Sequence, residues 1–303
     1  SGAYNATSNS ATVNAATANV SATKIYDGTT TLTSGQLSIT GVGGAVLSFT
    51  LGTASYSNAN VATSNKYVNI GTLALTGGAG TSAASNYTLP SSAYNATSNS
   101  ATVNAATANV SATKTYDGGT TLTSGQVTIT GVTVGANTEV LTYTGTASLS
   151  DANVATSNKY VVVSSMTLAN GGTGSTTGLA SNYNLPSGAY NATSNSASIS
   201  TASLGISMTA TYSGSTTVSS PTATLTGLAS ADSSATVSSV VINNKNVASA
   251  TYVISLVLSN SKQSNYSLNS SVNTTLGTST TNKVTLSAAN LTVTANSQTT
   301  TYG

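Results

Sequence analysis

The residues of this chain that could do acid–base or metal chemistry are few and widely spaced. Paired-carboxylate catalysis and Ca²⁺ binding both need several carboxylates at one site, and these acids stand mostly one to a neighbourhood. Serine is abundant, but the chain has no His, Cys, Arg or Trp, so no imidazole can activate a serine nucleophile. These residue types predict a protein that is not an enzyme and has no cofactor or metal site. The five acids are Asp27, Asp117, Glu139, Asp151 and Asp232.

One short motif, Tyr-Asp-Gly followed by hydroxyl residues, could be read as a small active site. It occurs in KIYDGTTT and KTYDGGTT, and in a third copy, ATYSGSTT, Ser replaces Asp. Asp-Gly after an alternating strand is typical of a turn, because Asp accepts bonds from nearby amides and Gly adopts positive φ. The third copy keeps the tyrosine, an anchor expected to pack at the edge of its module, and loses the only ionisable acid. We therefore interpret the motif as a strand-ending turn, in which Ser can replace Asp at small cost. Its residues are Tyr26, Asp27, Gly28, Tyr116, Asp117, Gly118, Tyr212, Ser213 and Gly214.

Two lysines precede this turn at equivalent positions, Lys24 and Lys114, on the face that alternation assigns to the interior. A Lys–Asn isopeptide cross-link there would stiffen the protein. However, Ala210 takes the position in the third copy, and an assisting acid is scarce. A lysine near a strand end more often extends its ammonium group to water, and this is the interpretation we favour.

Three Asn-Ala-Thr segments fit the acceptor pattern for N-glycosylation. In a chain so rich in Asn and Thr, chance matches are expected, so we interpret them as exposed turns. The asparagines concerned are Asn5, Asn95 and Asn191.

The composition favours an all-β protein with little charge. Hydrophobic residues make up 38% of the chain and charged residues only 4%. A Thr-rich, uncharged sequence with regularly spaced Val, Ile, Leu and Tyr is typical of strands. The net charge of +2 comes from scattered lysines, which form no basic stripe for nucleic acid. The longest apolar run, YVISLVL, is too short to span a bilayer.

Internal repetition is the strongest signal in the sequence. The segment YNATSNSATVNAATANVSATK begins at Tyr4 and recurs unchanged at Tyr94, and YNATSNSA begins again at Tyr190. The segments NVATSNKYV and SNYTLP also recur in the same order. We divide the chain into a closing strand of a preceding module, three modules, of which the third is degenerate, and the opening strand of a following module. The ranges are 1–17, 18–107, 108–203, 204–290 and 291–303.

Each module shows the alternation of β-strands. Leu204, Ile206 and Met208 fall on one face of the third module's first strand, and polar residues fall on the other. YVISLVL is apolar on both faces, which predicts a strand in the middle of a sheet. Short strands and turns in modules of this size predict immunoglobulin-like β-sandwiches. The junctions contain no Pro or Gly, so we expect the modules to follow one another directly in an extended rod.

The ordered set YDGTTT, NVATSNKYV and SNYTLPS resembles the YDG module of large bacterial filamentous-haemagglutinin-like adhesins. The closing LTVTANSQTTTYG resembles the start of a related MBG module. The resemblance implies a secreted protein of the bacterial cell surface with a role in adhesion, biofilm or fibre formation. The family's usual Asp-Lys-Asn-Val-Gly stretch is altered here at 58–62 and 151–155, and the third module has lost its Asp.

The leading functional hypothesis is a structural stalk or fibre segment whose partners are the adjacent modules of the same chain, or other copies in a fibre or matrix. A second hypothesis is that each module binds a surface glycan weakly and that avidity raises the affinity. A third is a pilin-like subunit whose first strand completes a neighbouring copy. Near-identical copies favour length and mechanics over a unique binding site.

Overall fold

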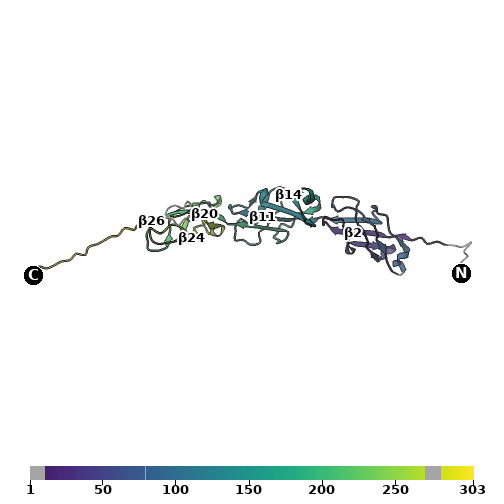
Figure 1. Ribbon diagram of the computed structural model, residues 1–303, viewed down its shortest axis with the longest axis horizontal. Coiled ribbons are helices and arrows are strands. Elements are labelled where there is room, and N and C mark those ends of the chain that lie inside the picture. The colour runs from purple at the N-terminus through teal and green to yellow at the C-terminus, as the bar shows by residue number, and fades with distance from the viewer. Residues whose placement is uncertain (1–10, 79, 270–280) are drawn as a thin grey trace. The chain divides into compact units, whose positions relative to one another are not determined.

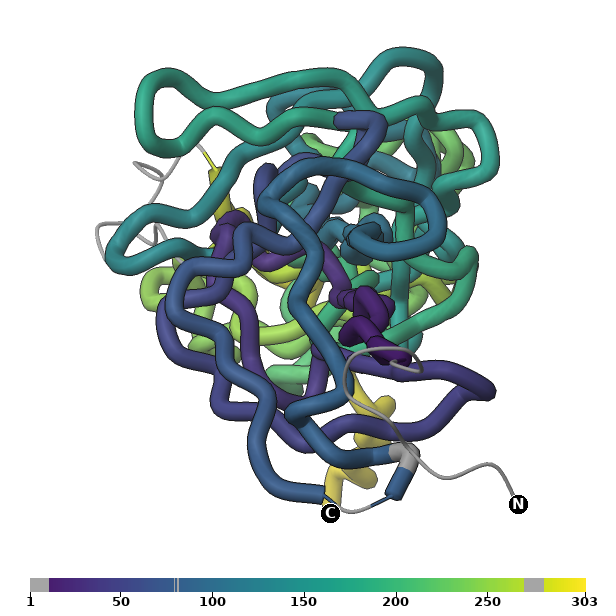
Figure 2. Tube along the Cα trace, turned by 90° about the vertical axis from the view of Figure 1, so that its right-hand side faces the viewer, coloured from purple at the N-terminus to yellow at the C-terminus, as the bar shows by residue number. Residues whose placement is uncertain are grey.

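The structure, a computed structural model, describes residues 11–78, 80–269 and 281–303. Its described residues form β-strands and single 3₁₀ turns without an α-helix (Figures 1 and 2). Part of the expected closing strand at 1–17 lies outside the described residues, and so does the whole of Asn5. The chain divides into two compact units. The first unit comprises Ser1–Ser111, Thr128–Thr146 and Val163–Asn195, and the second comprises Ala112–Val127, Ala147–Val162 and Ser196–Gly303.

Repeat 1 (18–107) is built around its first long strand. Strand β2 (Asn19–Ile25) pairs antiparallel with β3 (Leu37–Thr40) and parallel with β9 (Asn99–Asn104). Alternate residues of β2 are buried and exposed, as the sequence predicts. The first strand of the repeat therefore lies between the second strand and the last.

A second small sheet covers the buried face. Strands β5 (Ser55–Tyr56) and β6 (Val68–Asn69) pair antiparallel, and Thr31 bridges to β5. Their inward side chains, Tyr56 and Val68, are at most 1% exposed. The remaining pairs in this repeat are two residues long: β4 (Phe49–Thr50) with β7 (Ala74–Leu75), and β1 (Ala16–Thr17) with β8 (Tyr87–Thr88).

A buried asparagine ties the two sheets together. Asn99 of β9 accepts a hydrogen bond from the Val68 amide at 2.9 Å and donates to the Val68 carbonyl at 2.9 Å. In repeat 3, Asn282 makes the same two bonds with Val253. The side-chain amide thus takes the place of a neighbouring strand and satisfies buried backbone groups.

The chain passes from one repeat to the next without a linker. Strand β9 ends at Asn104, β10 spans Ala106–Thr107 and β11 spans Asn109–Thr115. In the second unit, β19 (Asn195–Ser200) is likewise followed by β20 (Ala202–Thr211) after one residue. In both passages a single residue separates consecutive strands.

Repeat 2 (108–203) has strands in both compact units. In the first unit, β14 (Asn137–Gly145) lies between β13 (Val127–Val134) and β17 (Met166–Asn170), all antiparallel. Strand β10 pairs parallel with β18 (Tyr183–Asn184). In the second unit, β15 lies between β12 and β16. The bounds of these strands are Ala147–Leu149, Thr121–Leu122 and Val161–Val162.

Repeat 3 (204–290) follows the plan of repeat 1. Strand β20 pairs antiparallel with β22 (Thr222–Thr226) and parallel with β26 (Asn282–Ser287). Its N-terminal end also pairs parallel with β25 (Tyr266–Leu268). The second sheet has the order β21-β23-β24, with bounds Thr217–Ser219, Val237–Ile242 and Val253–Leu258.

The prediction that YVISLVL is a central strand is wrong for the sheet that the structure describes. Strand β24 lies at the edge of that sheet, and Ile254 and Val257 are more than half exposed. An apolar run on both faces therefore reflects exposed aliphatic side chains here, not burial on both sides.

Two further findings concern the described part of the chain. None of its helical segments is long and apolar enough to cross a membrane. Nor do its acidic side chains gather into a group of three that could hold a metal ion.

Candidate functional site at the joint between repeats

The recurring motifs of repeats 1 and 2 each contact the following repeat at a junction that we call the joint. Joint 1 connects repeats 1 and 2 and lies within the first compact unit. Joint 2 connects repeats 2 and 3 and lies within the second. Each joint has a tyrosine–carboxylate contact and an asparagine–loop contact.

The first contact of joint 1 is a buried carboxylate shared by two tyrosines. Tyr26 of the first turn motif donates its hydroxyl to Glu139 Oε1 at 2.7 Å. Tyr183 of repeat 2 donates to Glu139 Oε2 at 2.6 Å and accepts a bond from the Val132 amide at 2.9 Å. The two rings meet edge to face, with centroids 5.4 Å apart. The motif tyrosine of repeat 1 is therefore bound inside repeat 2.

Joint 2 repeats this arrangement with different residues. Tyr116 donates to Asp232 Oδ2 at 2.8 Å, and Tyr266 donates to the same oxygen at 2.7 Å. Tyr266 also accepts a bond from the Ala229 amide at 3.0 Å. The rings are again edge to face, with centroids 5.3 Å apart.

The two carboxylates come from unrelated positions. Glu139 lies in strand β14, whereas Asp232 ends the 3₁₀ turn Ser230–Asp232. Both acids are less than 9% exposed. Sequence reasoning treated them as isolated acids, and their only signal is that each stands alone after the third strand of its repeat, β13 or β22. The structure brings both to the motif tyrosines.

These tyrosines are held as neutral hydrogen-bond donors. Burial, and after it the hydrogen bond to Glu139, raises the pKa of Tyr26 and of Tyr183. Burial and Asp232 raise the pKa of Tyr116 and Tyr266 in the same way. A hydrogen bond from a phenol to a carboxylate stabilises more than a neutral pair does, which suits a buried acid.

The second contact of each joint uses the recurring Ser-Asn-Tyr segment. In joint 1, Asn182 Oδ1 accepts a bond from the Val61 amide at 2.8 Å, and its Nδ2 donates to Asn60 Oδ1 at 2.9 Å. In joint 2, Asn265 accepts from the Val154 amide at 2.8 Å and donates to Asn153 at 3.1 Å. Lys262 of repeat 3 also donates to Asn153.

A buried lysine shapes the loop that receives this asparagine. Lys66 is 6% exposed and donates to the Val61 carbonyl at 2.8 Å and to the Thr63 carbonyl. Burial lowers the pKa of Lys66. Lys159 holds the equivalent loop of repeat 2 through Val154 and Thr156.

The glycine of the turn motif is required by both its backbone and its neighbours. Gly28 and Gly118 have φ of 77° and 84°, in the left-handed region that glycine adopts readily. A Cβ atom on Gly28 would lie 2.3 Å from a methyl of Val134, and one on Gly118 would lie 2.9 Å from Ala231. Both neighbours belong to the following repeat, so the turn lies close against it.

Within the turn, the aspartate holds a buried lysine. Lys24 Nζ donates to Asp27 Oδ1 at 2.6 Å and to the Thr29 carbonyl at 2.7 Å, and it lies 4.9 Å from the centre of the Tyr56 ring. The lysine side chain is 1% exposed and the aspartate 47%. Lys114 and Asp117 form the equivalent pair.

This burial shows that the interpretation of Lys24 and Lys114 as extending to water was wrong. The ammonium groups stay inside because turn carbonyls and an aspartate solvate them there. No asparagine side chain is among the described hydrogen-bond partners of either lysine, so the contacts do not support the Lys–Asn cross-link. The asparagines of the glycosylation pattern, Asn95 and Asn191, are exposed and accept turn amides with their side chains.

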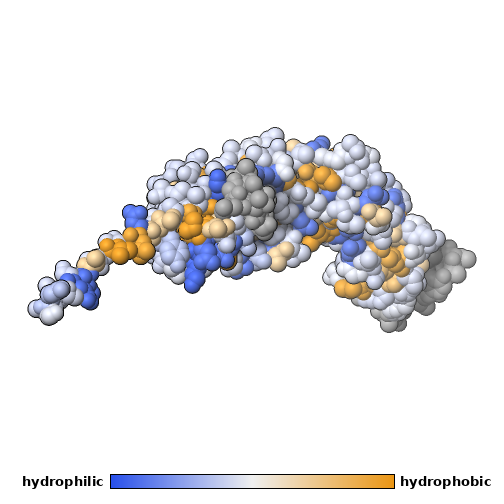
Figure 3. Space-filling model, turned by 60° about the vertical axis from the view of Figure 1, so that its left-hand side comes forward, coloured by the Kyte–Doolittle hydropathy of each residue, from blue (hydrophilic) through white to orange (hydrophobic). Residues whose placement is uncertain are grey.

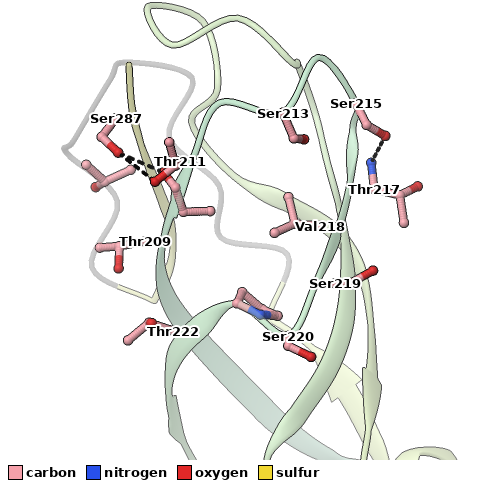
Figure 4. A pocket seen from close by; sticks show the side chains of 13 residues that line it. Thr209, Thr211, Ser213, Ser215, Thr217, Val218, Ser219, Ser220, Thr222 and Ser287 are labelled. Atoms are coloured by element: carbon pink, nitrogen blue, oxygen red, sulfur yellow. Dashed lines mark hydrogen bonds between the residues drawn. The ribbon is translucent and has the colours of Figure 1, made fainter. Parts of the chain in front are cut away.

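The third turn differs from the other two. Tyr212 is 40% exposed, against 6% for Tyr26 and Tyr116. Ser213 makes no side-chain hydrogen bond in the described part of the chain, and Ser215 instead accepts the Thr217 amide at 3.0 Å (Figure 4). Beside this turn is an open hollow lined mainly by hydroxyls, which supply hydrogen bonds but no charge or aromatic ring.

Removing one hydroxyl from joint 1 should destabilise the protein measurably. We expect Tyr26→Phe to lower the free energy of unfolding by about 1.5–3 kcal/mol, because it removes a hydrogen bond to a buried charged group. Chemical denaturation of the whole chain measures the effect. Tyr94→Phe, at an exposed tyrosine of repeat 1, is the matched control. Equal effects of the two substitutions would contradict the shared-carboxylate contact.

The lysine–aspartate pair should behave as a unit. Repeat 3 lacks both partners, with Ala210 and Ser213 in their places. It therefore does not show that a repeat tolerates loss of the aspartate while the lysine is retained. We expect Asp27→Ser to cost roughly 1–3 kcal/mol, since it leaves a buried ammonium with fewer partners. We expect it to cost less in a Lys24→Ala background. A double-mutant cycle measures the coupling, and strict additivity would rule out the pairing.

Stability should vary little between about pH 5 and 9 and fall outside that range. Burial opposes ionisation of Asp27, but bonds from Lys24 and Thr29 outweigh it, so the pKa is lowered. That contribution is complete above the ordinary carboxyl pKa of about 4 and is lost as the pH falls through the folded value. Burial raises the pKa of Tyr56 to about 12. That contribution is complete below the ordinary pKa of about 10 and is lost as the pH rises towards the folded value.

Calorimetric unfolding midpoints across this range, combined with tyrosinate absorbance at high pH, test the expectation. Tyrosine ionisation that precedes unfolding, or a steep change in the midpoint near neutral pH, would contradict it.

Comparison with known proteins identifies the recurring unit. The profile of the YDG domain matches residues 9–98 and 97–194, two tandem copies that together cover more than half of the chain. Repeat 3 (204–290) lies outside both matches. No curated protein and no solved structure matches the chain. The tandem matches contain the Tyr-Asp-Gly turns and the carboxylate of joint 1, and the chain belongs to the YDG domain family.

Proposed function

We propose that this chain is a structural segment of a secreted bacterial surface adhesin, a stalk or fibre that gives reach and mechanical continuity. In this proposal, three immunoglobulin-like β-sandwich repeats follow one another in an extended rod at the cell surface. The observation that carries the proposal is the joint, because recurring tyrosines and asparagines of the repeats bind one repeat to the next.

The direct passage between strands supports the same conclusion. One residue separates β19 from β20, so the chain has no flexible segment at that point. The shared carboxylate and the asparagine contact then fix the following repeat at two places. A protein that needed freely moving binding modules would gain nothing from such connections.

The chemistry available for other functions is sparse. No catalytic role is proposed, because the acids of joints 1 and 2 are engaged by tyrosine hydroxyls and lie buried. The hydroxyl-lined hollow of repeat 3 has a smaller counterpart in repeat 2 beside Lys114. Repeated weak glycan binding through these hollows is the second candidate.

Small-angle X-ray scattering of the whole chain tests the stalk. With a strand rise of about 3.3 Å per residue, each repeat should add roughly 35–45 Å to the maximum dimension. We expect the variant with Tyr26→Phe and Tyr116→Phe to give a broader distance distribution, with Tyr94→Phe as the control. A compact wild-type profile would refute the proposal. Saturable binding to a glycan array by a compact chain would favour the second candidate.

A further inference from the structure

Repeats 1 and 2 each contact the repeat that follows them through a turn-motif tyrosine and glycine and an Asn-Val loop. Repeat 3 carries the same groups. We call this set the terminal face and define it as Tyr212, Gly214, Asn246 and Val247. The equivalent groups of repeat 1 are Tyr26, Gly28, Asn60 and Val61, and each of these contacts repeat 2.

The turn part of the terminal face is open. Tyr212 is 40% exposed, and its hydroxyl has no hydrogen-bond partner among the residues that the structure describes. Gly214 has a φ of 78°, like its counterparts. A Cβ atom on Gly214 would find only the Tyr212 hydroxyl, 3.9 Å away, whereas one on Gly28 would collide with the following repeat.

The loop part of the terminal face is already shaped as in the occupied joints. Asn244 accepts the Asn246 amide at 2.9 Å, as Asn58 accepts the Asn60 amide at 2.8 Å. In the described residues, the amide of Val247 has no acceptor corresponding to the one that Asn182 gives Val61. The loop therefore presents its backbone donor without needing to rearrange.

The segment that leaves repeat 3 also has the pattern of a buried first strand. Leu291 and Val293 follow Ser287 at the same spacing as Leu204 and Ile206 follow Ser200. Leu204 and Ile206 are 1% and 2% exposed, whereas Leu291 and Val293 are 89% and 83% exposed. Apolar side chains are visible along this segment at the left of Figure 3.

We propose that the terminal face receives a β-module that presents a buried carboxylate beside a tyrosine, together with an asparagine carboxamide. The carboxylate accepts the Tyr212 hydroxyl, and the carboxamide oxygen accepts the Val247 amide. This inference rests on the proposed function and specifies the partner of its last joint.

The required carboxylate excludes the first repeat of a second copy as the occupant. Thr40 bridges to Val46 as Thr130 pairs with Val140, so Ala45 stands where Glu139 stands in repeat 2. The only acid of repeat 1 is Asp27, which is paired with Lys24. A module like repeat 2 carries all three groups, namely Glu139, Tyr183 and Asn182. Repeat 2 is therefore the probe that the chain itself supplies.

The experiment replaces residues 288–303 of the whole chain with a copy of residues 105–200. We expect Tyr212→Phe to lower the calorimetric unfolding midpoint of this extended chain by a few degrees, the loss we also expect of Tyr116→Phe, and to leave the original chain unchanged. Changing the glutamate of the added copy, equivalent to Glu139→Gln, should produce the same loss, and the two losses should not add.

Two results would overturn the inference. One is an added copy that folds while Tyr212→Phe has no effect, and the other is an added copy that stays unfolded or protease-sensitive. In both cases, losses from Tyr26→Phe and Tyr116→Phe would leave the proposed function standing. No effect at those two tyrosines would instead refute the joints on which the proposed function depends.

Discussion

A carboxylate buried between two tyrosine hydroxyls is the interaction on which the connected repeats depend. Taking a carboxylate out of water is costly unless hydrogen bonds replace its hydration. Glu139 obtains one of its two hydroxyls from its own repeat and the other from the repeat before it. The carboxylate therefore has both of its hydroxyl donors only when the two repeats are in contact. Both repeats that supply the hydroxyls of joint 1 have these residues in the first compact unit, and the residues of joint 2 lie in the second.

The features that the sequence predicts well are those set by local rules. Period-two alternation places the inward residues of β2 and β20, and turn chemistry places Gly28 and Gly118 at positive φ. The partners of the motif tyrosines could not be predicted in this way. Tyr26 and Glu139 are 113 residues apart, and the equivalent acid of repeat 3 lies on a different element. Because the carboxylate that accepts the tyrosine hydroxyls stands at a different position in each repeat, aligning the repeats does not reveal it.

The lysines show a different limit of sequence reasoning. Alternation placed Lys24 inward, but the general preference of lysine for water outweighed that signal in the interpretation. In the structure, the carbonyl of Thr29 and the carboxylate of Asp27 solvate the ammonium group in place of water. Repeat 3 has lost lysine and aspartate together, as expected if removing one partner alone leaves an uncompensated charge. It keeps Asn265, Tyr266 and Asn282, the groups that join its sheets and bind the preceding repeat.

The parallel pairing of the first and last strands of a repeat has a mechanical consequence. Strand β2 enters repeat 1 and β9 leaves it in the same direction, and their register runs from Val20 with Asn99 to Ile25 with Asn104. Tension applied at the two ends of the repeat would slide these strands past each other in shear. The hydrogen bonds between them would then share the load instead of opening one after another like a zipper. Because forced unfolding is governed by the unfolding rate, such a repeat can resist pulling even with modest thermodynamic stability.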